Sequence, residues 1–182
     1  MPKLIDVLST SGLRTGETLP RSEIHRLGKP HRAIHLYLFN SRNELLLQRR
    51  SLTVDNYPGV LSISVLGHVD AREYSATTVR REIEEELGLD TSALKIDFLF
   101  TYFSQATLSE SYIDRQFNDI YVTHTDLDLA LIRFDPSEVS EIVFVPFERF
   151  QKMLSDPASD LAQVYADECR DLVYFLEGRF SH

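Results

Sequence analysis

The sequence predicts an α/β or α+β fold, in which several strands are mixed with a few helices. Two observations support this prediction. Short apolar runs between turn residues are typical of strands, whereas residues 75–87 and the C-terminal region repeat apolar residues at helical spacing. The chain has 182 residues, of which 43% are hydrophobic, and this suffices for one domain with a sizeable core. We therefore expect a single domain over residues 1–182.

The N-terminal part of the chain is predicted to contain a hairpin and a short helix. Residues 4–19 favour a hairpin, and residues 20–27 favour a short helix. This part, residues 1–30, is expected to pack on the core. Apolar stretches predict further strands at 33–39, 44–48, 61–66, 94–103, 116–124 and 141–145. The polar segment 104–115 is expected to be a loop.

Two helices are expected near the C-terminus. A short one begins at Pro146 and reaches Leu154. A longer amphipathic helix over about residues 157–178 is indicated by its apolar positions, which are Leu161, Tyr165, Cys169, Leu172 and Leu176. Cys169 is the only cysteine, so we interpret it as a core residue and expect no disulfide framework.

Composition excludes several classes of function. The formal net charge is −9, which disfavours binding of a nucleic-acid polymer, because phosphate contacts depend on lysine and arginine. No apolar run approaches the length of a membrane span, and no signal peptide is evident. We therefore expect a cytoplasmic protein without a membrane partner. A homodimer is a further expectation, which the composition leaves open.

One segment, residues 67–89, has a spacing that stands out from the rest. Its pattern is Gly67-x5-Glu73-x7-Arg81-Glu82-Ile83-x-Glu85-Glu86-x-Gly88-Leu89. Within it, residues 75–87 predict a helix, with Ser75 as the N-cap and Gly88 just past the last turn. The apolar stripe of this helix consists of Ala76, Val79, Ile83 and Leu87.

The opposite face of this helix carries Glu82, Glu85 and Glu86. The spacing of i, i+3 and i+4 places their three carboxylates on one surface. Like charges repel at that spacing, whereas a divalent cation would reverse the sign of the interaction. Hard oxygen ligands suit Mg²⁺, with Mn²⁺ as an alternative. A solvated acidic face is the other interpretation of such a run.

The pattern of residues 67–89 is that of the Nudix box, so the chain resembles the Nudix superfamily. The resemblance implies a mixed β-sheet sandwiched between α-helices, with the box helix against the sheet. The implied metal ligands are the Gly67 carbonyl and the carboxylates of Glu82, Glu85 and Glu86. Catalytic roles are implied for Arg81, Glu85 and Glu86, and Glu73 is implied to pair with Arg81 and brace the loop.

Outside the box, residues 4–90 resemble the branch with type 1 isopentenyl-diphosphate isomerases and isomerase-like Nudix hydrolases. The matching pieces include Glu23-Ile-His25-Arg-Leu-Gly28, Leu47-Gln-Arg-Arg-Ser51, Tyr57-Pro-Gly59 and Gly67-His68. Two departures favour a hydrolase. Leu66 stands where the isomerases carry a catalytic cysteine, and segment 52–56 lacks their diphosphate-binding lysine.

Other residues of that branch have weaker counterparts here. Asp119 is a loose candidate for the second catalytic carboxylate of the isomerases. The metal-binding histidines of the isomerases correspond to positions at or near His25, His31 and His68. We interpret these histidines as ordinary packing or surface residues, with a second metal site as the alternative.

The resemblance implies Mg²⁺-dependent hydrolysis of a diphosphate linkage in a nucleoside diphosphate derivative or a related small organic diphosphate. Metal-bound water would attack phosphorus, and a carboxylate would take its proton. Glu85, Glu110 and Asp119 are the alternatives for that base. Arg49 and Arg50 are the candidate phosphate clamps. An isopentenyl-diphosphate isomerase and a nucleotide-binding domain without turnover are the alternative functions.

Overall fold

The structure is a computed structural model that describes residues 3–54, 57–162 and 165–180. In order along the chain, its elements are β1 (Leu4–Leu8), β2 (Arg14–Pro20), α1 (Arg21–Leu27), β3 (His31–Phe39), β4 (Glu44–Arg50), β5 (Leu61–Ser62), β6 (Val65–His68), α2 (Ser75–Leu87), β7 (Ile96–Ser109), β8 (Tyr112–His124), the 3-10 helix η1 (Leu129–Leu131), β9 (Val139–Pro146), α3 (Phe147–Ser155) and α4 (Ala166–Phe180). The expected mixture of strands and helices is confirmed.

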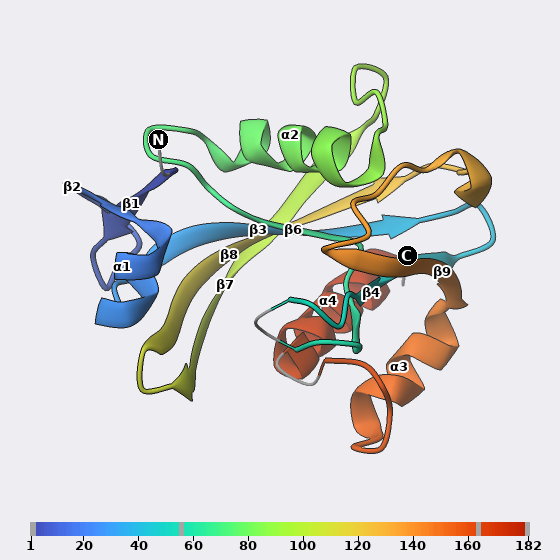
Figure 1. Ribbon diagram of the computed structural model, residues 1–182. Helices are drawn as coiled ribbons and strands as arrows, with labels where there is room; N and C mark the ends of the chain where they lie inside the picture. The colour runs from blue at the N-terminus through green and yellow to red at the C-terminus, as the bar shows by residue number, and fades with distance from the viewer. Residues whose placement is uncertain (1–2, 55–56, 163–164, 181–182) are drawn as a thin grey trace.

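A mixed sheet forms the centre of the molecule (Figure 1). Its main path runs β5-β4-β3-β8-β7, while β6 pairs with β3 and β9 pairs with β4. The contact between β3 and β8 is parallel, whereas the other pairs are antiparallel. β1 and β2 form a separate two-stranded sheet, which confirms the predicted N-terminal hairpin.

Helices cover both faces of the sheet, with α2 on one side and α3 and α4 on the other (Figure 1). Side chains of β3 alternate between the two layers, as those of a strand must. Leu36 and Leu38 pack with Val79 and Ile83 of α2, whereas Tyr37 packs with Leu172 of α4. Burial of each such side chain stabilises the fold by about 1.5–3 kcal/mol. β3 therefore organises both halves of the core.

Helix α2 has the predicted bounds and ends at Gly88, whose φ of 65° lies in the left-handed region. Two details of its prediction were wrong. Ala76 is exposed, and Thr78 occupies the buried position instead. The N-cap residue is Tyr74, because the Ser75 hydroxyl is turned toward the Tyr121 hydroxyl, 2.9 Å away.

The predicted strand 61–66 is divided into β5 and β6, which pair with different neighbours. Between them, the buried Ser64 hydroxyl donates to the carbonyl of Leu46 at 2.6 Å and accepts from the amide of Leu38 at 2.9 Å. One side chain thus joins β3 and β4, which are otherwise registered as partners only at Phe39 and Leu45 within the described residues. The break allows β6 to carry the chain onto β3.

The expected loop 104–115 is instead part of a long hairpin formed by β7 and β8. Gln105 pairs with Arg115, and Ala106 pairs with Asp114. β3 begins at His31, opposite Gln116 of β8, so the tip of the hairpin extends beyond β3. The tip lacks a core to cover, and this explains why its sequence is polar and resembles a loop.

The C-terminal helix begins later than the predicted residue 157, because α4 starts at Ala166. The preceding segment is extended at Leu161, which forms a parallel bridge with Leu61 of β5. Leu161 is buried in the same cluster as Leu172 and Leu176, although it does not belong to the helix. The prediction failed because burial in a shared core can imitate helical spacing.

Helix α4 also carries a buried carboxylate that the sequence pattern did not reveal. Glu168 is 2% exposed. Its oxygens lie 2.7 and 2.8 Å from His35 Nδ1, and they accept hydrogen bonds from the Tyr37 hydroxyl at 2.7 Å and from Asn118 Nδ2 at 3.0 Å. Burial raises the pKa of Cys169, which confirms its expected place in the core. A polar network therefore fastens α4 to β3 and β8.

We expect Glu168→Ala to lower the free energy of unfolding by about 3 kcal/mol or more, because each buried donor left without an acceptor costs about 1–3 kcal/mol. Urea unfolding followed by circular dichroism measures this change. The matched control is Asp171→Ala, which removes an exposed carboxylate from the same helix. Equal stability losses in the two variants would contradict the role assigned to the buried network.

Candidate active site

The box residues lie where β6 ends, on the loop that follows it and on α2. We define the box loop as residues 69–74, between β6 and α2. Because Val79, Ile83 and Leu87 bury one face of α2, the three glutamates Glu82, Glu85 and Glu86 are carried by the remaining surface. The helix itself therefore determines that these carboxylates share one side, as the spacing predicted.

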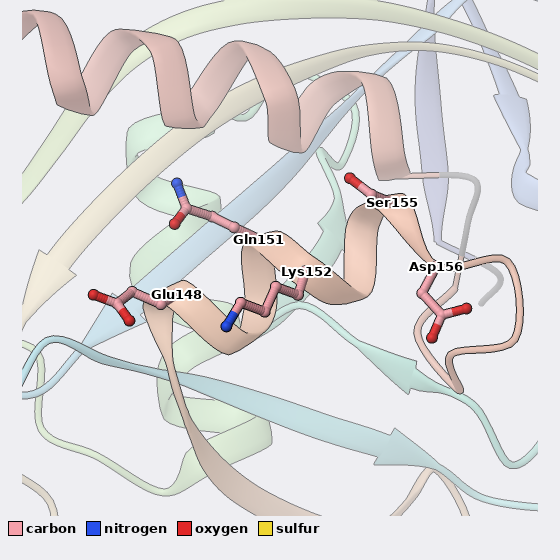
Figure 2. Close-up of a pocket in the computed structure, with 5 residues that line it drawn as sticks. All are labelled: Glu148, Gln151, Lys152, Ser155 and Asp156. Carbon is pink, nitrogen blue, oxygen red and sulfur yellow. The ribbon is translucent and has the colours of Figure 1, made fainter.

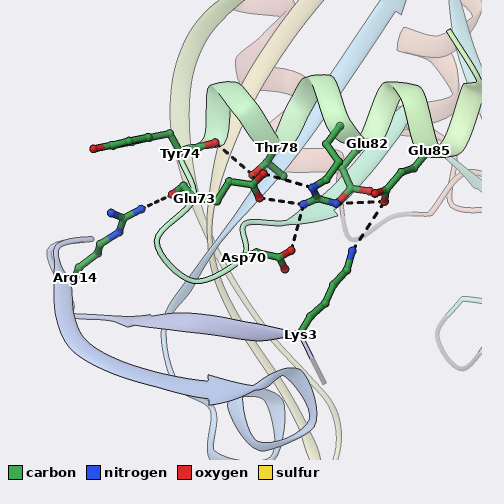
Figure 3. A network of polar contacts seen from close by, with 9 residues as sticks. Lys3, Arg14, Asp70, Glu73, Tyr74, Thr78, Glu82 and Glu85 are labelled. Atoms are coloured by element: carbon green, nitrogen blue, oxygen red, sulfur yellow. Dashed lines mark hydrogen bonds and ion pairs between the residues drawn. The ribbon is translucent and has the colours of Figure 1, made fainter. Parts of the chain in front are cut away.

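The guanidinium group of Arg81 joins the box loop to the glutamates of α2. Its Nη1 donates to Glu82 Oε1 at 2.7 Å and to Glu85 Oε2 at 3.2 Å. Its Nη2 donates to Glu73 Oε2 at 3.1 Å and lies 3.8 Å from Asp70 Oδ2. Figure 3 shows these carboxylates around one centre. The structure thus contains the Glu73–Arg81 contact that the resemblance implies.

These contacts shift the pKa values of the residues involved. Burial alone would lower the pKa of Arg81, but its bond to Glu73 and the negative charge of Glu82 raise it overall. Burial would raise the pKa of Glu73, but hydrogen bonds from Arg81 and Thr78 lower it. The loop carboxylate and the guanidinium therefore stabilise each other in their charged forms.

Glu86 has a different environment. Its carboxylate accepts one long hydrogen bond, 3.4 Å from Gln48 Nε2. Burial, together with the negative charges of Glu82 and Glu138, raises the pKa of Glu86 well above its usual value. Burial also raises the pKa of Glu82. Carboxylates that are drawn in from water and repel one another are suited to a divalent cation.

Gly67 allows Glu82 to occupy its position. A β-carbon at Gly67 would lie 2.4 Å from Cδ of Glu82, far closer than atoms can approach. The need for glycine is steric here, because Gly67 is not among the glycines with positive φ. The missing side chain leaves space in which the Glu82 carboxylate lies beside the β6 backbone. Gly67 and the glutamates thus form a set of oxygen donors whose chemistry fits Mg²⁺.

A second group of side chains that could bind a metal lies at the start of β3 and the end of β6, beside α1. Within the described residues, the one set of three or more His, Cys, Asp or Glu side chains with mutually close ligand atoms consists of His25, His31 and His68. These ligand atoms all lie within 4.8 Å of one another. They come from α1, β3 and β6, so the structure brings together three histidines that are distant in sequence. Glu82, Glu85 and Glu86 are not gathered as closely.

Asp114 on β8 completes the histidine group. Its Oδ1 lies 3.3 Å from His25 Nδ1 and 3.8 Å from His31 Nε2. All three atoms are buried, and none has a hydrogen-bond partner. Burial lowers the pKa of His31 to about 4 and that of His68 well below its usual value, so both imidazoles are neutral at pH 7. Neutral imidazoles with unused nitrogens are the form that binds metal.

The two candidate phosphate clamps have different surroundings. Arg49 is engaged in structural contacts, because its Nε donates to Glu141 Oε2 at 2.9 Å and its Nη2 lies 2.8 Å from Asp160 Oδ2. Arg50 lies two residues after Gln48, and its positive charge acts on both Glu86 and Tyr112. The charge of Arg50 thus reaches one box glutamate and also Tyr112, whose ring stacks on His25.

The two candidate bases outside the box have different surroundings. Glu110 is exposed in the turn between β7 and β8. Asp119 is 5% exposed and accepts from Arg32 Nη1 at 2.6 Å and Thr101 Oγ1 at 2.7 Å. Asp119 is registered with Ile34 and Leu66 with His35, which places Asp119 and Leu66 on opposite faces of the sheet.

Sequence reasoning did not identify Asp114 and Arg21. Arg21 begins α1, and its positive charge adds to the effect of burial in lowering the pKa of His31 and His68. Asp114 lies in the segment that was expected to be a loop. Recognising the alternation of β8 through residues 112–116 would have placed Asp114 on a strand, but its histidine partners follow only from the sheet register.

Figure 2 shows a surface pocket on α3 and the residue after it. It is lined by Glu148, Gln151, Lys152, Ser155 and Asp156. It is shallow and open, and neither the box nor the histidine group contributes a residue to it.

Across the described residues, no helix combines the length and the apolar character needed to cross a membrane.

Comparison with known proteins places this geometry in a family. Residues 29–167 match the NUDIX domain. Nudix hydrolase 3 from Arabidopsis thaliana is 36% identical over 159 residues, covering 84% of this chain and 21% of that protein. An isopentenyl-diphosphate Delta-isomerase from Streptomyces coelicolor is 29% identical over 176 residues, covering 96% of this chain and 87% of that protein.

The fold is shared with solved structures. DR0079 from Deinococcus radiodurans superimposes with a TM-score of 0.74 at 21% identity, covering 93% of this chain and 98% of that one. The chain aligns with only part of some relatives. It spans about a fifth of the Arabidopsis protein, and its match covers 57% of isopentenyl-diphosphate Delta-isomerase 1 from Aromatoleum aromaticum.

We expect Gly67→Ala to weaken Mg²⁺ binding, because the new methyl group would displace the Glu82 carboxylate. Overpacking should also lower the free energy of unfolding by about 1–3 kcal/mol. Isothermal titration calorimetry with Mg²⁺ and thermal unfolding measure the two effects. Gly178→Ala serves as the control, since an added β-carbon there meets no atom within 4 Å. Unchanged Mg²⁺ affinity in Gly67→Ala would contradict the steric role of Gly67.

Proposed function

Because this chain belongs to the NUDIX domain family, we propose that it hydrolyses a diphosphate linkage in a small organic molecule with a divalent cation. A nucleoside diphosphate derivative is the substrate class we favour. The observation that supports this proposal most directly is the convergence of Glu82 and Glu85 on Arg81, beside the weakly partnered Glu86. Arg81 compensates the charges of Glu82 and Glu85, and a divalent cation would add the positive charge that draws Glu86 into the same group.

The proposed cation is Mg²⁺, with Mn²⁺ as an alternative, held by the carboxylates of Glu82, Glu85 and Glu86 and by the Gly67 carbonyl. When bound, it would acidify a water molecule and neutralise charge on the diphosphate. Arg81 would keep Glu82 and Glu85 directed at the cation, while Glu73 holds Arg81 from the loop side. Arg50, whose positive charge acts on Glu86, would bind phosphate oxygens.

Within the box, we assign proton transfer to Glu85, with Glu86 as the alternative base. The Glu85 side chain is 52% exposed and can therefore reach a water molecule at the surface. Asp119 is engaged by two donors, and Glu110 lies in the turn between β7 and β8, at the far end of the hairpin from α2 (Figure 1). Both are therefore weaker candidates than the box carboxylates.

We further propose that His25, His31, His68 and Asp114 bind a transition metal. Imidazole nitrogens and one carboxylate suit Zn²⁺ or a similar ion. This group is also the observation that favours a second candidate function, isopentenyl-diphosphate isomerisation, as the names of several relatives suggest. Leu66 argues against it, because an alkyl side chain can neither donate nor accept the proton that isomerisation requires.

A panel of nucleoside diphosphate and triphosphate derivatives, incubated with Mg²⁺ or Mn²⁺, tests the proposed function through phosphate release. In parallel, isopentenyl diphosphate is incubated in deuterated water and examined by mass spectrometry. We expect release from at least one nucleotide derivative and no deuterium uptake. Deuterium uptake would assign the isomerase instead, and nucleotide binding without release would assign a binding domain.

We expect Glu85→Gln and Glu86→Gln each to lower kcat by roughly 10²–10⁴, the range for loss of an acid–base group. Steady-state phosphate release with the best substrate measures this. Glu84→Gln is the matched control, because Glu84 is on the same helix but is exposed and accepts from Thr91 Oγ1 at 2.7 Å. A comparable fall in kcat in the control would count against a specific role for the two glutamates.

We expect one Zn²⁺ ion to bind the histidine group tightly at pH 7, because the imidazoles of His31 and His68 are neutral there. Calorimetric titration should show this site in the unmodified protein and its loss in His68→Ala. His124→Ala removes an exposed histidine from the end of β8 and should leave the site intact. A Zn²⁺ isotherm that is the same in all three proteins would exclude this assignment.

A further inference from the structure

The N-terminal hairpin of β1 and β2 reaches the proposed metal site from outside the matched family region. That region begins at residue 29, whereas the hairpin occupies residues 4–20. Figure 3 shows the hairpin beside the box loop, with Arg14 directed toward the loop and Lys3 toward Glu85 of α2. The hairpin therefore lies outside the matched NUDIX region and contacts the box loop within it.

Backbone contacts align the two segments. The amide of Ala71 donates to the carbonyl of Leu4 at 2.7 Å, and Ile5 forms an antiparallel bridge with Asp70. The Ile5 side chain is 2% exposed, so β1 cannot move away from the core freely. The box loop thus continues the two-stranded sheet at the edge of β1.

Asp6 and Arg14 add side-chain contacts to the same loop. Asp6 Oδ2 accepts from the amide of Arg72 at 2.9 Å and forms an ion pair with Arg14, whose Nε lies 3.0 Å away. Arg14 Nη2 also donates to the carbonyl of Glu73. Arg72 has a φ of 69°, a left-handed conformation that is uncommon for residues other than glycine. The loop therefore needs an external partner to hold Arg72, and Asp6 supplies it.

The consequence for the metal site follows along a continuous chain of contacts. Arg14 holds the backbone of Glu73, the Glu73 carboxylate holds Arg81, and Arg81 holds Glu82 and Glu85. Before β1, Lys3 Nζ lies 3.9 Å from Glu85 Oε2, so the open end of the hairpin also approaches a glutamate directly.

We propose that Asp6 and Arg14 are positioning residues for the divalent-cation site, holding the box loop in the shape that directs Arg81 at the glutamates. This inference rests on the proposed function, since it assumes that the glutamates bind a cation. The two side chains do not touch the cation or the substrate. They act through Glu73 and Arg81, and their removal leaves the glutamates present but less well oriented.

The test is the Mg²⁺ Kd of the full-length protein. It is measured from the backbone amide chemical shifts of α2 during titration with Mg²⁺. Mg²⁺ prefers oxygen ligands, so the histidine group contributes little to the signal. Loss of an outer-shell partner typically weakens metal binding by about 10-fold or more. We therefore expect Asp6→Ala and Arg14→Ala each to raise the Mg²⁺ Kd by about 10-fold, and amide exchange at Ala71 and Arg72 to accelerate.

Two further variants separate positioning from general destabilisation. Glu17→Ala removes a charge from the same hairpin, but Glu17 pairs with Lys29 at 3.6 Å and belongs to the exposed part of β2. It should leave the Mg²⁺ Kd unchanged. Asp6→Asn keeps an oxygen that can accept from the Arg72 amide, so it should restore part of the affinity lost in Asp6→Ala.

An unchanged Mg²⁺ Kd in Asp6→Ala and Arg14→Ala would overturn the positioning role, as would an equal loss of affinity in Glu17→Ala. Failure of the proposed function gives a different result. If the unmodified protein shows no Mg²⁺-dependent shifts in α2, the cation site itself is refuted, and the inference that depends on it is refuted as well.

Discussion

The candidate site depends on one guanidinium group placed among carboxylates. Glu82 and Glu85 lie on one helix face, where like charges at i and i+3 destabilise a helix unless a cation intervenes. Arg81 supplies the positive charge, and it also binds Glu73 on the box loop. Loop geometry and helix electrostatics are therefore coupled, so a change that moves the loop also changes how the glutamates are arranged.

The sheet supports this arrangement because its two faces pack against different helices. Leu36 and Leu38 of β3 pack against α2. This packing fixes the position of the helix, and therefore of its glutamates, relative to the sheet. The other face of β3 carries His35 and Tyr37, which are joined to the buried Glu168 of α4. Buried hydrogen bonds are directional and resist sliding better than apolar contacts do, so this network favours a single position for α4.

The same fold contains the elements of two chemistries, and single side chains decide between them. The histidine group of His25, His31 and His68 would suit a metal-dependent isomerase. Leu66, however, lies on the same face as His35 and offers no proton, while the Asp119 carboxylate faces the other side and is neutralised by Arg32. The glutamates of α2 need neither of these residues, which is why we favour hydrolysis.

Local regularities of the sequence determined the box helix, its end at Gly88 and the common face of its three glutamates, because helical spacing alone fixes these relations. Most strands followed from apolar runs, including the inner parts of β7 and β8, but the extension of this hairpin through residues 104–115 did not, because that segment is polar. Only tertiary structure decided which residues meet across elements. The histidine group with Asp114, the structural role of Arg49 and the contact of Asp6 and Arg14 with the box loop depend on strand register and long-range packing. Sequence spacing contains no information about such distances, because the residues are brought together by the packing of the whole chain.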